Sequence, residues 1–182
     1  MPTPRLIFDA ALFDELIREL ARRGKGRRES GAFLLTDHDH PSDRVPTPVT
    51  AVAYYDDLDP SCLTGAIAFH ADGYTALSAR CRRDRLRVVG DIHTHPFERV
   101  AQSPIDAAHP MLALDGHVAL IAPHFAVGVT SADALGVHVR EQRQWVSSYG
   151  GQAAALVCIR GRYASPLLSR LLAGWKRLWR RA

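Results

Sequence analysis

Two histidines and a following aspartate are the residues of this chain best suited to chemistry. One residue separates His93 from His95, and ten residues separate His95 from Asp106. Ser103 lies within that interval, and Glu29 lies far upstream. Imidazole nitrogens and carboxylate oxygens bind zinc, while a second carboxylate and a hydroxyl can transfer protons or donate hydrogen bonds beside it. Together the five residues have the side chains of a hydrolytic zinc site.

The two histidines follow a segment that is predicted to be a β-strand. Residues 88–92 form a short apolar run rich in β-branched side chains, and Pro96 bounds it. Successive side chains of a strand alternate between its two faces, so His93 and His95 project to the same side, about 7 Å apart along the chain. Two imidazoles in that arrangement can converge on one metal ion.

The aspartate is expected at the start of a short helix. Residues 103–111 have Ser103 at the N-cap position and Pro104 at the first helical position. Asp106 lies three residues beyond Ser103 and therefore on the same helix face. Two strand histidines and one helix aspartate make a three-ligand site. The fourth tetrahedral position stays open for water, which is the catalytic rather than the structural arrangement of zinc.

Each part of this pattern also has an ordinary structural explanation. Residues 103–106 form a capping box, which is compatible with a ligand role because a cap fixes the backbone that aims Asp106. A His-x-His pair among nine histidines is explained equally by one polar strand face, and Glu29 by a charge that follows a basic turn. The combination favours the zinc site, because each residue type lies at the spacing that the site requires.

The same residues resemble the JAMM motif of the JAB/MPN+ metalloprotease family. The resemblance is carried by Glu29, by His-Thr-His-Pro at 93–96, by Ser-Pro-Ile-Asp at 103–106 and by the apolar run 31–35, and it covers residues 5–146. All five polar positions are present, so the chain is similar to the active branch of the family and to its stand-alone prokaryotic members. The resemblance implies an α/β sandwich with a central mixed β-sheet flanked by helices, an architecture like that of the cytidine deaminases.

In this hypothesis each polar residue has a separate role. Zinc (Zn²⁺) bound by His93, His95 and Asp106 would lower the pKa of its water toward neutrality. Glu29 would serve as the general base and later deliver the proton to the leaving amine. Ser103 would donate a hydrogen bond to the developing oxyanion. The reaction is then hydrolysis of an amide bond without a covalent intermediate.

Asp91 shares a strand face with His93 and His95, and two interpretations of it stay open. It could orient one of the histidines from behind, as carboxylates often do around a metal. It could equally be a solvated residue at the edge of the strand, which is the commoner situation for an aspartate.

The resemblance also implies a class of substrate. Related enzymes cleave isopeptide or peptide bonds after the C-terminal glycine of ubiquitin or a ubiquitin-like protein, in deconjugation or in precursor processing. Some prokaryotic members accompany activating and conjugating enzymes in modification or antiphage systems, and others process sulfur-carrier proteins. A non-catalytic binding module of the same fold is a further alternative. The acidic loop with Asp56, Asp57 and Asp59 could meet a basic substrate tail, or it could simply be solvated.

Composition agrees with a globular enzyme. The chain has 182 residues, of which 47% are hydrophobic and 23% charged, with a net charge of +4. Its three cysteines lack metal-binding spacing, and neither a signal sequence nor a long apolar stretch is present. We therefore expect a cytoplasmic protein that does not bind nucleic acid, and membrane contact is the least favoured of the interactions considered. The arginine clusters at 22–28 and 80–87 lack the stacking aromatics of a nucleic-acid surface.

The periodicity predicts one domain and an extension. The expected elements are helices at 8–23 and 71–85 and strands at 32–36, 49–55, 117–122, 128–130 and 135–146, the last being a strand pair or a long edge strand. Residues 1–148 would form the metalloprotease domain, and residues 149–182 a C-terminal extension. Residues 165–182 have the spacing of a basic amphipathic helix. That helix could pack on the domain, dock on a partner protein or contact a membrane surface.

Overall fold

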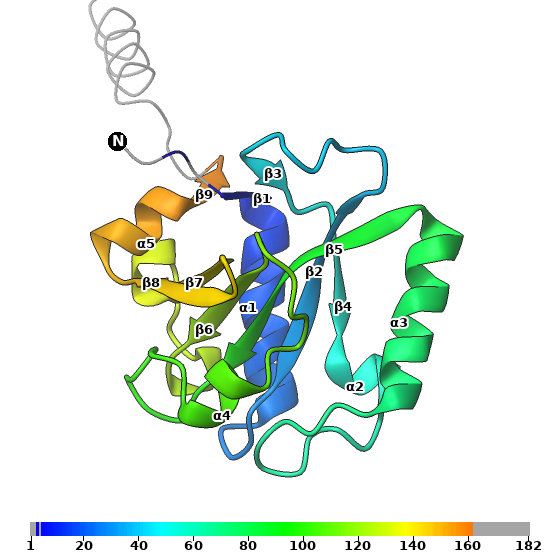
Figure 1. The fold of residues 1–182 in the computed structure, drawn as a ribbon. Coiled ribbons are helices and arrows are strands. Elements are labelled where there is room, and N and C mark those ends of the chain that lie inside the picture. Colours follow the sequence, from blue (N-terminus) through cyan, green and yellow to red (C-terminus); the bar gives the residue numbers. More distant parts are fainter. Residues whose placement is uncertain (1–2, 4, 162–182) are drawn as a thin grey trace, which may run out of the picture.

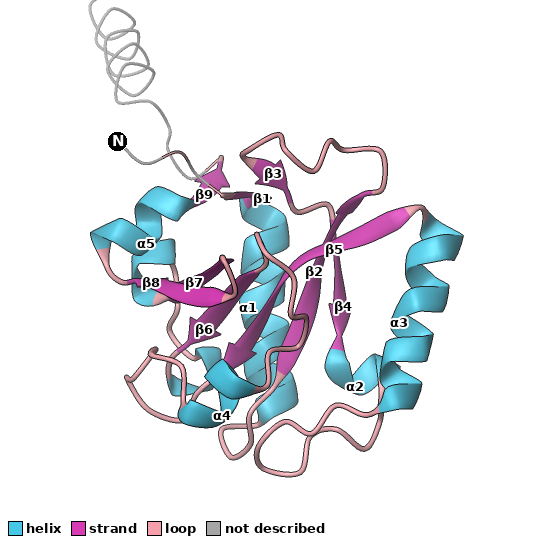
Figure 2. Ribbon diagram, in the orientation of Figure 1, coloured by secondary structure: helices cyan, strands magenta, loops and turns pink. Residues whose placement is uncertain are grey.

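The computed structural model describes residue 3 and residues 5–161, and its centre is a six-stranded sheet (Figures 1 and 2). The order of its strands is β4-β2-β5-β6-β7-β8. Their bounds are β2 Gly31–Asp37, β4 Ala51–Tyr54, β5 Leu86–Thr94, β6 Val118–Ala122, β7 Gly136–Glu141 and β8 Gln144–Ser148. Strands β5 and β6 run parallel, whereas the other neighbours are antiparallel. The predicted α/β sandwich with a central mixed sheet is confirmed.

The two faces of this sheet carry separate hydrophobic cores. Helix α1 (Ala10–Gly24) buries Leu16 and Leu20 against the face that presents Leu34, Ile92 and Leu120. Because strand side chains alternate, the neighbouring Phe33 and Leu35 point to the opposite face. There they pack with Tyr55 of α2 (Tyr55–Leu58) and Leu77 of α3 (Ala71–Asp84). Residues Asp91 and His93 of β5 alternate with the α1-facing Ile92, so they lie on the α3 side.

A second, three-stranded parallel sheet lies at one end of α1 and was not predicted. It has the order β3-β1-β9, with β1 Leu6–Asp9, β3 Thr47–Pro48 and β9 Val157–Arg160. These strands are short, and pairing between distant segments rather than a local pattern defines them. Asp9 ends β1 and caps α1, its side chain accepting a hydrogen bond from the Ala11 amide at 2.8 Å.

The beginning of the expected C-terminal extension packs on the domain. Helix α5 (Gly151–Leu156) buries Ala153, and β9 then pairs in register with the whole of β1. The predicted amphipathic helix at 165–182 lies outside the described residues. Within the described part of the chain, no helix is both long enough and apolar enough to cross a bilayer.

The prediction of a strand at 128–130 is wrong. This segment lies between two short 3₁₀ helices, η1 (His124–Ala126) and η2 (Ala132–Ala134). Gly128 has a φ of 78°, which turns the chain away from an extended path. Val129 is nevertheless buried in the α1 core, and this burial explains the apolar pattern that suggested a strand. The predicted late strand pair is confirmed as the hairpin β7–β8.

Gly31 offers a test of packing next to the histidine strand. A Cβ atom at this position would lie 2.2 Å from Cε2 of Tyr55 and 2.9 Å from the Ile92 carbonyl oxygen. We expect Gly31→Ala to lower the free energy of unfolding by about 1–3 kcal/mol through overpacking, measured by urea denaturation. Gly24→Ala is the control, because its Cβ would meet the Ser30 Oγ at an ordinary 3.5 Å. Equal stability of the two variants would contradict this explanation.

Candidate metal centre

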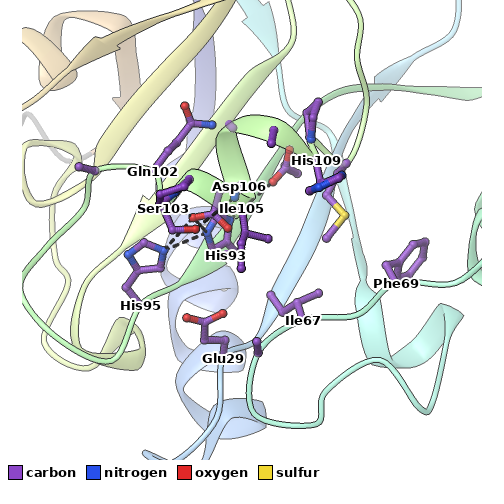
Figure 3. A pocket seen from close by; sticks show the side chains of 18 of the residues that line it. Glu29, Ile67, Phe69, His93, His95, Gln102, Ser103, Ile105, Asp106 and His109 are labelled. Atoms are coloured by element: carbon purple, nitrogen blue, oxygen red, sulfur yellow. Dashed lines mark hydrogen bonds and ion pairs between the residues drawn. The ribbon is translucent and has the colours of Figure 1, made fainter.

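His93, His95 and Asp106 come together into one group (Figure 3). The Nε2 atoms of His93 and His95 are 3.2 Å apart, and the Asp106 Oδ2 lies 3.4 Å from Nε2 of His95 and 3.8 Å from Nε2 of His93. Nitrogen and oxygen ligands about 2.0–2.1 Å from a tetrahedral zinc ion are about 3.3 Å from one another. The spacing of the three atoms therefore fits a common metal ion without rearrangement of the backbone.

The end of β5 fixes the two imidazoles. The backbone amide of His95 donates to the Ala122 carbonyl at 2.8 Å, which continues the pairing of β5 with β6 beyond Thr94. Nδ1 of His95 lies 2.9 Å from the carbonyl oxygen of Arg99. A carbonyl oxygen only accepts, so Nδ1 carries the proton and Nε2 keeps its lone pair for a metal.

Helix α4 (Pro104–Ala108) positions the carboxylate through the predicted capping box. The Asp106 amide donates to the Ser103 Oγ at 3.1 Å, and the Ser103 amide donates to the Asp106 Oδ2 at 2.7 Å. The same Oδ2 faces both histidines. Capping and metal binding are thus compatible here, because the cap bond holds the carboxylate toward the imidazoles. Ser103 itself lines the adjoining cavity.

Glu29 joins this group although 63 residues separate it from His93. The Ser30 amide donates to the Thr94 Oγ1 at 3.0 Å, the Thr94 amide donates to the Ser30 carbonyl at 2.9 Å, and Gly31 pairs with His93 across the antiparallel β2–β5 ladder. Figure 3 shows the Glu29 carboxylate turned toward the histidines. Burial raises the pKa of Glu29 above its ordinary 4.5, while His93 and His95 oppose this shift.

Asp91 is buried, so its interpretation as a solvated edge residue is wrong. Only 3% of its surface is exposed. Its Oδ1 lies 2.6 Å from Nε2 of His117, and its Oδ2 accepts from the Tyr55 hydroxyl at 3.2 Å. Burial by itself raises the pKa of Asp91, but the bond with His117 and the nearby His93 outweigh it and lower the pKa to about 2. No local pattern indicates these two partners, because they depend on the β5–β6 register and on the position of α2.

A cavity of about 750 Å³ adjoins the metal-binding group. Its polar end contains Glu29, the two histidines, Ser103 and Asp106, and its other part is mostly apolar (Figure 3). The larger apolar side chains in its wall are Ile67, Phe69, Tyr74, Phe97, Ile105, Met111 and Trp145. Phe97 and Ile105 are 70% and 72% exposed, respectively, although they flank the ligands. The cavity is therefore open to solvent beside the polar group.

The acidic loop is largely engaged within the protein. Arg23 lies 2.6 Å from a carboxylate oxygen of Asp56 and 2.7 Å from one of Asp57. The Asp59 carboxylate accepts from the Ser61 hydroxyl at 2.7 Å, and it lies 2.7 Å from Nδ1 of His70. None of the three aspartates lines the cavity. Recognition of a basic substrate tail by this loop would have to compete with these internal contacts.

A proton and a zinc ion are expected to compete for His93. Burial lowers the pKa of His93, but the carboxylates of Asp106 and Asp91 outweigh it and raise the pKa to about 9. Burial raises the pKa of Asp106, yet His93 and His95 hold it well below its usual range. In the metal-free protein at neutral pH, His93 is therefore protonated and Asp106 ionised. Zinc binds a neutral imidazole, so it must displace the His93 proton.

The affinity of the metal-free protein for zinc should therefore rise with pH. Below a pH of about 9 we expect the dissociation constant to fall about tenfold for each pH unit, because one proton leaves His93 per ion bound. Calorimetry in two buffers of different ionisation enthalpy measures the protons released. Zinc binding that is independent of pH and releases no proton would contradict this expectation.

Comparison with known proteins supports the fold but not a family. No protein-family profile matches the sequence. A solution structure from Desulfitobacterium hafniense matches with 16% identity and a TM-score of 0.56, covering 87% of this chain and 95% of that chain. A solution structure from Salinibacter ruber matches with 18% identity and a TM-score of 0.53, covering 87% and 94%. These two similarities show that the mixed α/β fold occurs in other proteins.

A third similarity is weaker. The crystal structure of a JAB1/MPN domain protein from Archaeoglobus fulgidus matches with 12% identity and a TM-score of 0.41, covering 82% of this chain and 98% of that chain. This value is too low to support an argument about function. The fold and the His93, His95 and Asp106 group define a mixed α/β protein with a candidate metal centre, and its chemistry must be argued from the site itself.

Proposed function

We propose that this protein is a JAMM-type zinc metallopeptidase that hydrolyses amide bonds. The observation that carries the proposal is the meeting of four residues in one cavity. Two imidazole nitrogens and a carboxylate oxygen lie at tetrahedral ligand spacing, and the half-buried Glu29 borders the same space. His93, His95 and Asp106 would hold zinc, which acts on bound water and carbonyl groups as a Lewis acid.

Three side chains around the proposed ion would orient a ligand, transfer protons and stabilise the oxyanion. His95 keeps its proton on Nδ1 against the Arg99 carbonyl, which leaves Nε2 free as a ligand. Glu29 takes the proton of the attacking water and delivers it to the leaving nitrogen, a role that suits a carboxylate whose pKa burial has raised. The Ser103 hydroxyl donates a hydrogen bond to the developing oxyanion, while its oxygen still accepts a hydrogen bond from the Asp106 amide of the cap. No covalent intermediate is formed.

The substrate that we propose is the C-terminal glycine tail of a ubiquitin-like protein. The resemblance to the JAMM motif suggests this class, and the open, largely apolar cavity beside the ligands can accommodate an extended uncharged backbone. Glycine residues next to the bond let that backbone approach the ion closely. The reaction would be deconjugation or precursor processing in a bacterial ubiquitin-like modification or antiphage system, alongside activating and conjugating enzymes. A sulfur-carrier protein is the alternative substrate.

A purely binding role has less support than catalysis. A binding module of the same fold needs neither a metal-ligand set nor a carboxylate beside it. Here Glu29 lines the same cavity as the ligands, and His93, His95 and Asp106 all act on its pKa. This proximity is what a general base requires.

The proposed function is tested with a panel of linear fusions and lysine-linked conjugates. Each carries a ubiquitin-like or sulfur-carrier domain ending in Gly-Gly, and mass spectrometry identifies the products of the zinc-loaded protein. In water enriched in ¹⁸O, we expect the label in the new glycine carboxylate and loss of cleavage when a chelator removes the metal. A zinc-loaded protein that cleaves no member of the panel would contradict the proposal.

A further inference from the structure

Behind the metal-binding group lies a buried polar cluster that the proposed mechanism does not use. It consists of Asp91, Tyr55 and His117, from β5, α2 and the residue before β6. Asp91 and His117 are 3% and 5% exposed, and the Tyr55 side chain is fully buried. Ionised groups are rarely buried to this extent unless a specific role or partner retains them. The cluster therefore requires an explanation beyond stability.

The orientation of the His93 ring connects this cluster to the metal centre. Nε2 of His93 faces His95 and Asp106, at 3.2 Å and 3.8 Å. Nδ1, on the other side of the ring, faces the Asp91 Oδ2 at 4.0 Å. This distance is longer than a hydrogen bond, so Asp91 acts on the ring as a nearby negative charge. Because both groups are nearly excluded from water, solvent screens that charge only weakly.

We propose that Asp91 is a positioning residue that prepares His93 to bind the metal through Nε2. The proposal rests on the metal centre of the proposed function. A negative charge beside Nδ1 favours the neutral tautomer that has its proton on Nδ1, which leaves the Nε2 lone pair directed at His95 and Asp106. For His95, the Arg99 carbonyl accepts a hydrogen bond from Nδ1 at 2.9 Å. Each histidine thus has an oxygen beside its Nδ1, a backbone oxygen within hydrogen-bond distance for His95 and a carboxylate charge at 4.0 Å for His93.

Tyr55 and His117 hold the carboxylate in place. The Tyr55 hydroxyl donates to Oδ2, the oxygen that faces His93, and His117 bonds Oδ1 at 2.6 Å. Tyr55 is itself fixed by ring contacts with Phe33 and Phe69, whose centroids lie 4.9 Å and 5.4 Å away. The aromatic packing of the α3 side of the sheet thereby fixes the position of Asp91, and through it the orientation of the metal ligand.

The test compares zinc affinity with stability in matched variants. We expect Asp91→Asn to weaken zinc binding by the folded protein about 10–100-fold, measured by chelator competition at a pH above 9, where a proton on His93 no longer competes with zinc. Tyr55→Phe keeps the carboxylate and should weaken binding less. Asp59→Asn is the control: Asp59 is also buried, at 6% exposed, and also contacts a histidine, but it does not line the cavity. This control should retain the affinity of the wild type even if it unfolds more easily.

A merely structural role would lower the stability of the metal-free protein and leave the affinity of the folded fraction unchanged. Asp91→Asn with zinc affinity within about threefold of the wild type would therefore overturn the proposal. If that variant does not fold, NMR of the zinc-loaded wild type decides. We expect ¹⁵N chemical shifts that place the proton of the His93 ring on Nδ1 and the metal on Nε2, and metal binding through Nδ1 would equally overturn the proposal. Cleavage is measured in a separate assay. A protein that binds zinc through this arrangement but cleaves no peptide would refute the proposed function and leave the role of Asp91 intact.

Discussion

Glu29→Gln is expected to reduce the turnover number by about 10²–10⁴-fold while zinc remains bound. The amide of glutamine has nearly the shape of the carboxylate but cannot accept the proton of the attacking water. Glu29 is outside the ligand group of His93, His95 and Asp106, so its loss leaves the three metal ligands in place. The checks are the turnover number on a Gly-Gly fusion and the zinc content of the same sample.

Glu98→Gln is the matched control for this variant. Glu98 is an exposed carboxylate on the loop that follows the histidines, and it does not line the cavity. Its loss changes the net charge equally and should leave turnover within about twofold of the wild type. Near-normal turnover of Glu29→Gln would show that another group is the general base. Loss of zinc from that variant would instead make Glu29 a metal ligand.

Asp106→Asn is expected to remove both the metal and the activity. Substitution of outer partners of a metal ligand already weakens binding about 10–100-fold, so loss of the charged ligand itself should exceed about 100-fold. The asparagine oxygen can still accept from the Ser103 amide, which preserves the start of α4. Zinc content after dialysis and the turnover number measure the two effects, and circular dichroism checks the fold.

Asp115→Asn is the control for this second prediction. Asp115 is exposed and accepts from the Arg143 amide at 3.0 Å, outside the cavity. Its substitution should leave zinc content and turnover unchanged. Full zinc occupancy in Asp106→Asn would contradict the assignment of Asp106 as a ligand. The contrast with Glu29→Gln matters most, because one variant should keep the metal without turnover and the other should lose both.

The local parts of the metal centre could be predicted from the sequence because short-range rules determine them. Alternation along a strand places His93 and His95 on one face, and the N-cap rule places Ser103 at the start of α4. The structure confirms the strand, the cap and the capping box. The convergence of Asp106 with the histidines also requires the path of the loop at 96–102, which no local rule determines.

The surroundings of the site depend on long-range pairing, so the resemblance to the JAMM motif, and no local rule, predicts Glu29 in the site. Glu29 reaches the histidines only because Ser30 and Thr94 bond across β2 and β5. Asp91 is buried because His117 and Tyr55 arrive from distant segments. An isolated sequence cannot distinguish such an aspartate from a solvated one, since its immediate neighbours are the same in both cases.

The differences between the predicted and the observed strands have a similar origin. The strands β1, β3 and β9 are two to four residues long and form only through pairing with one another. The segment at 128–130 has the apolar composition of a strand because Val129 is buried, but β7 already occupies the edge of β6. The hydrophobic pattern of the sequence predicts which of these segments are buried. Hydrogen-bond pairing with a neighbouring strand determines which buried segments become strands.

Titration of zinc into the metal-free protein, with the cleavage rate of a Gly-Gly fusion as the readout, tests the central claim most directly. Three side chains can bind one ion and would leave the fourth tetrahedral position for water, so we expect the rate to rise from zero in proportion to zinc and to level off at one ion per chain. Cleavage by the metal-free protein that added zinc does not change would contradict the assignment of His93, His95 and Asp106 as a catalytic metal centre.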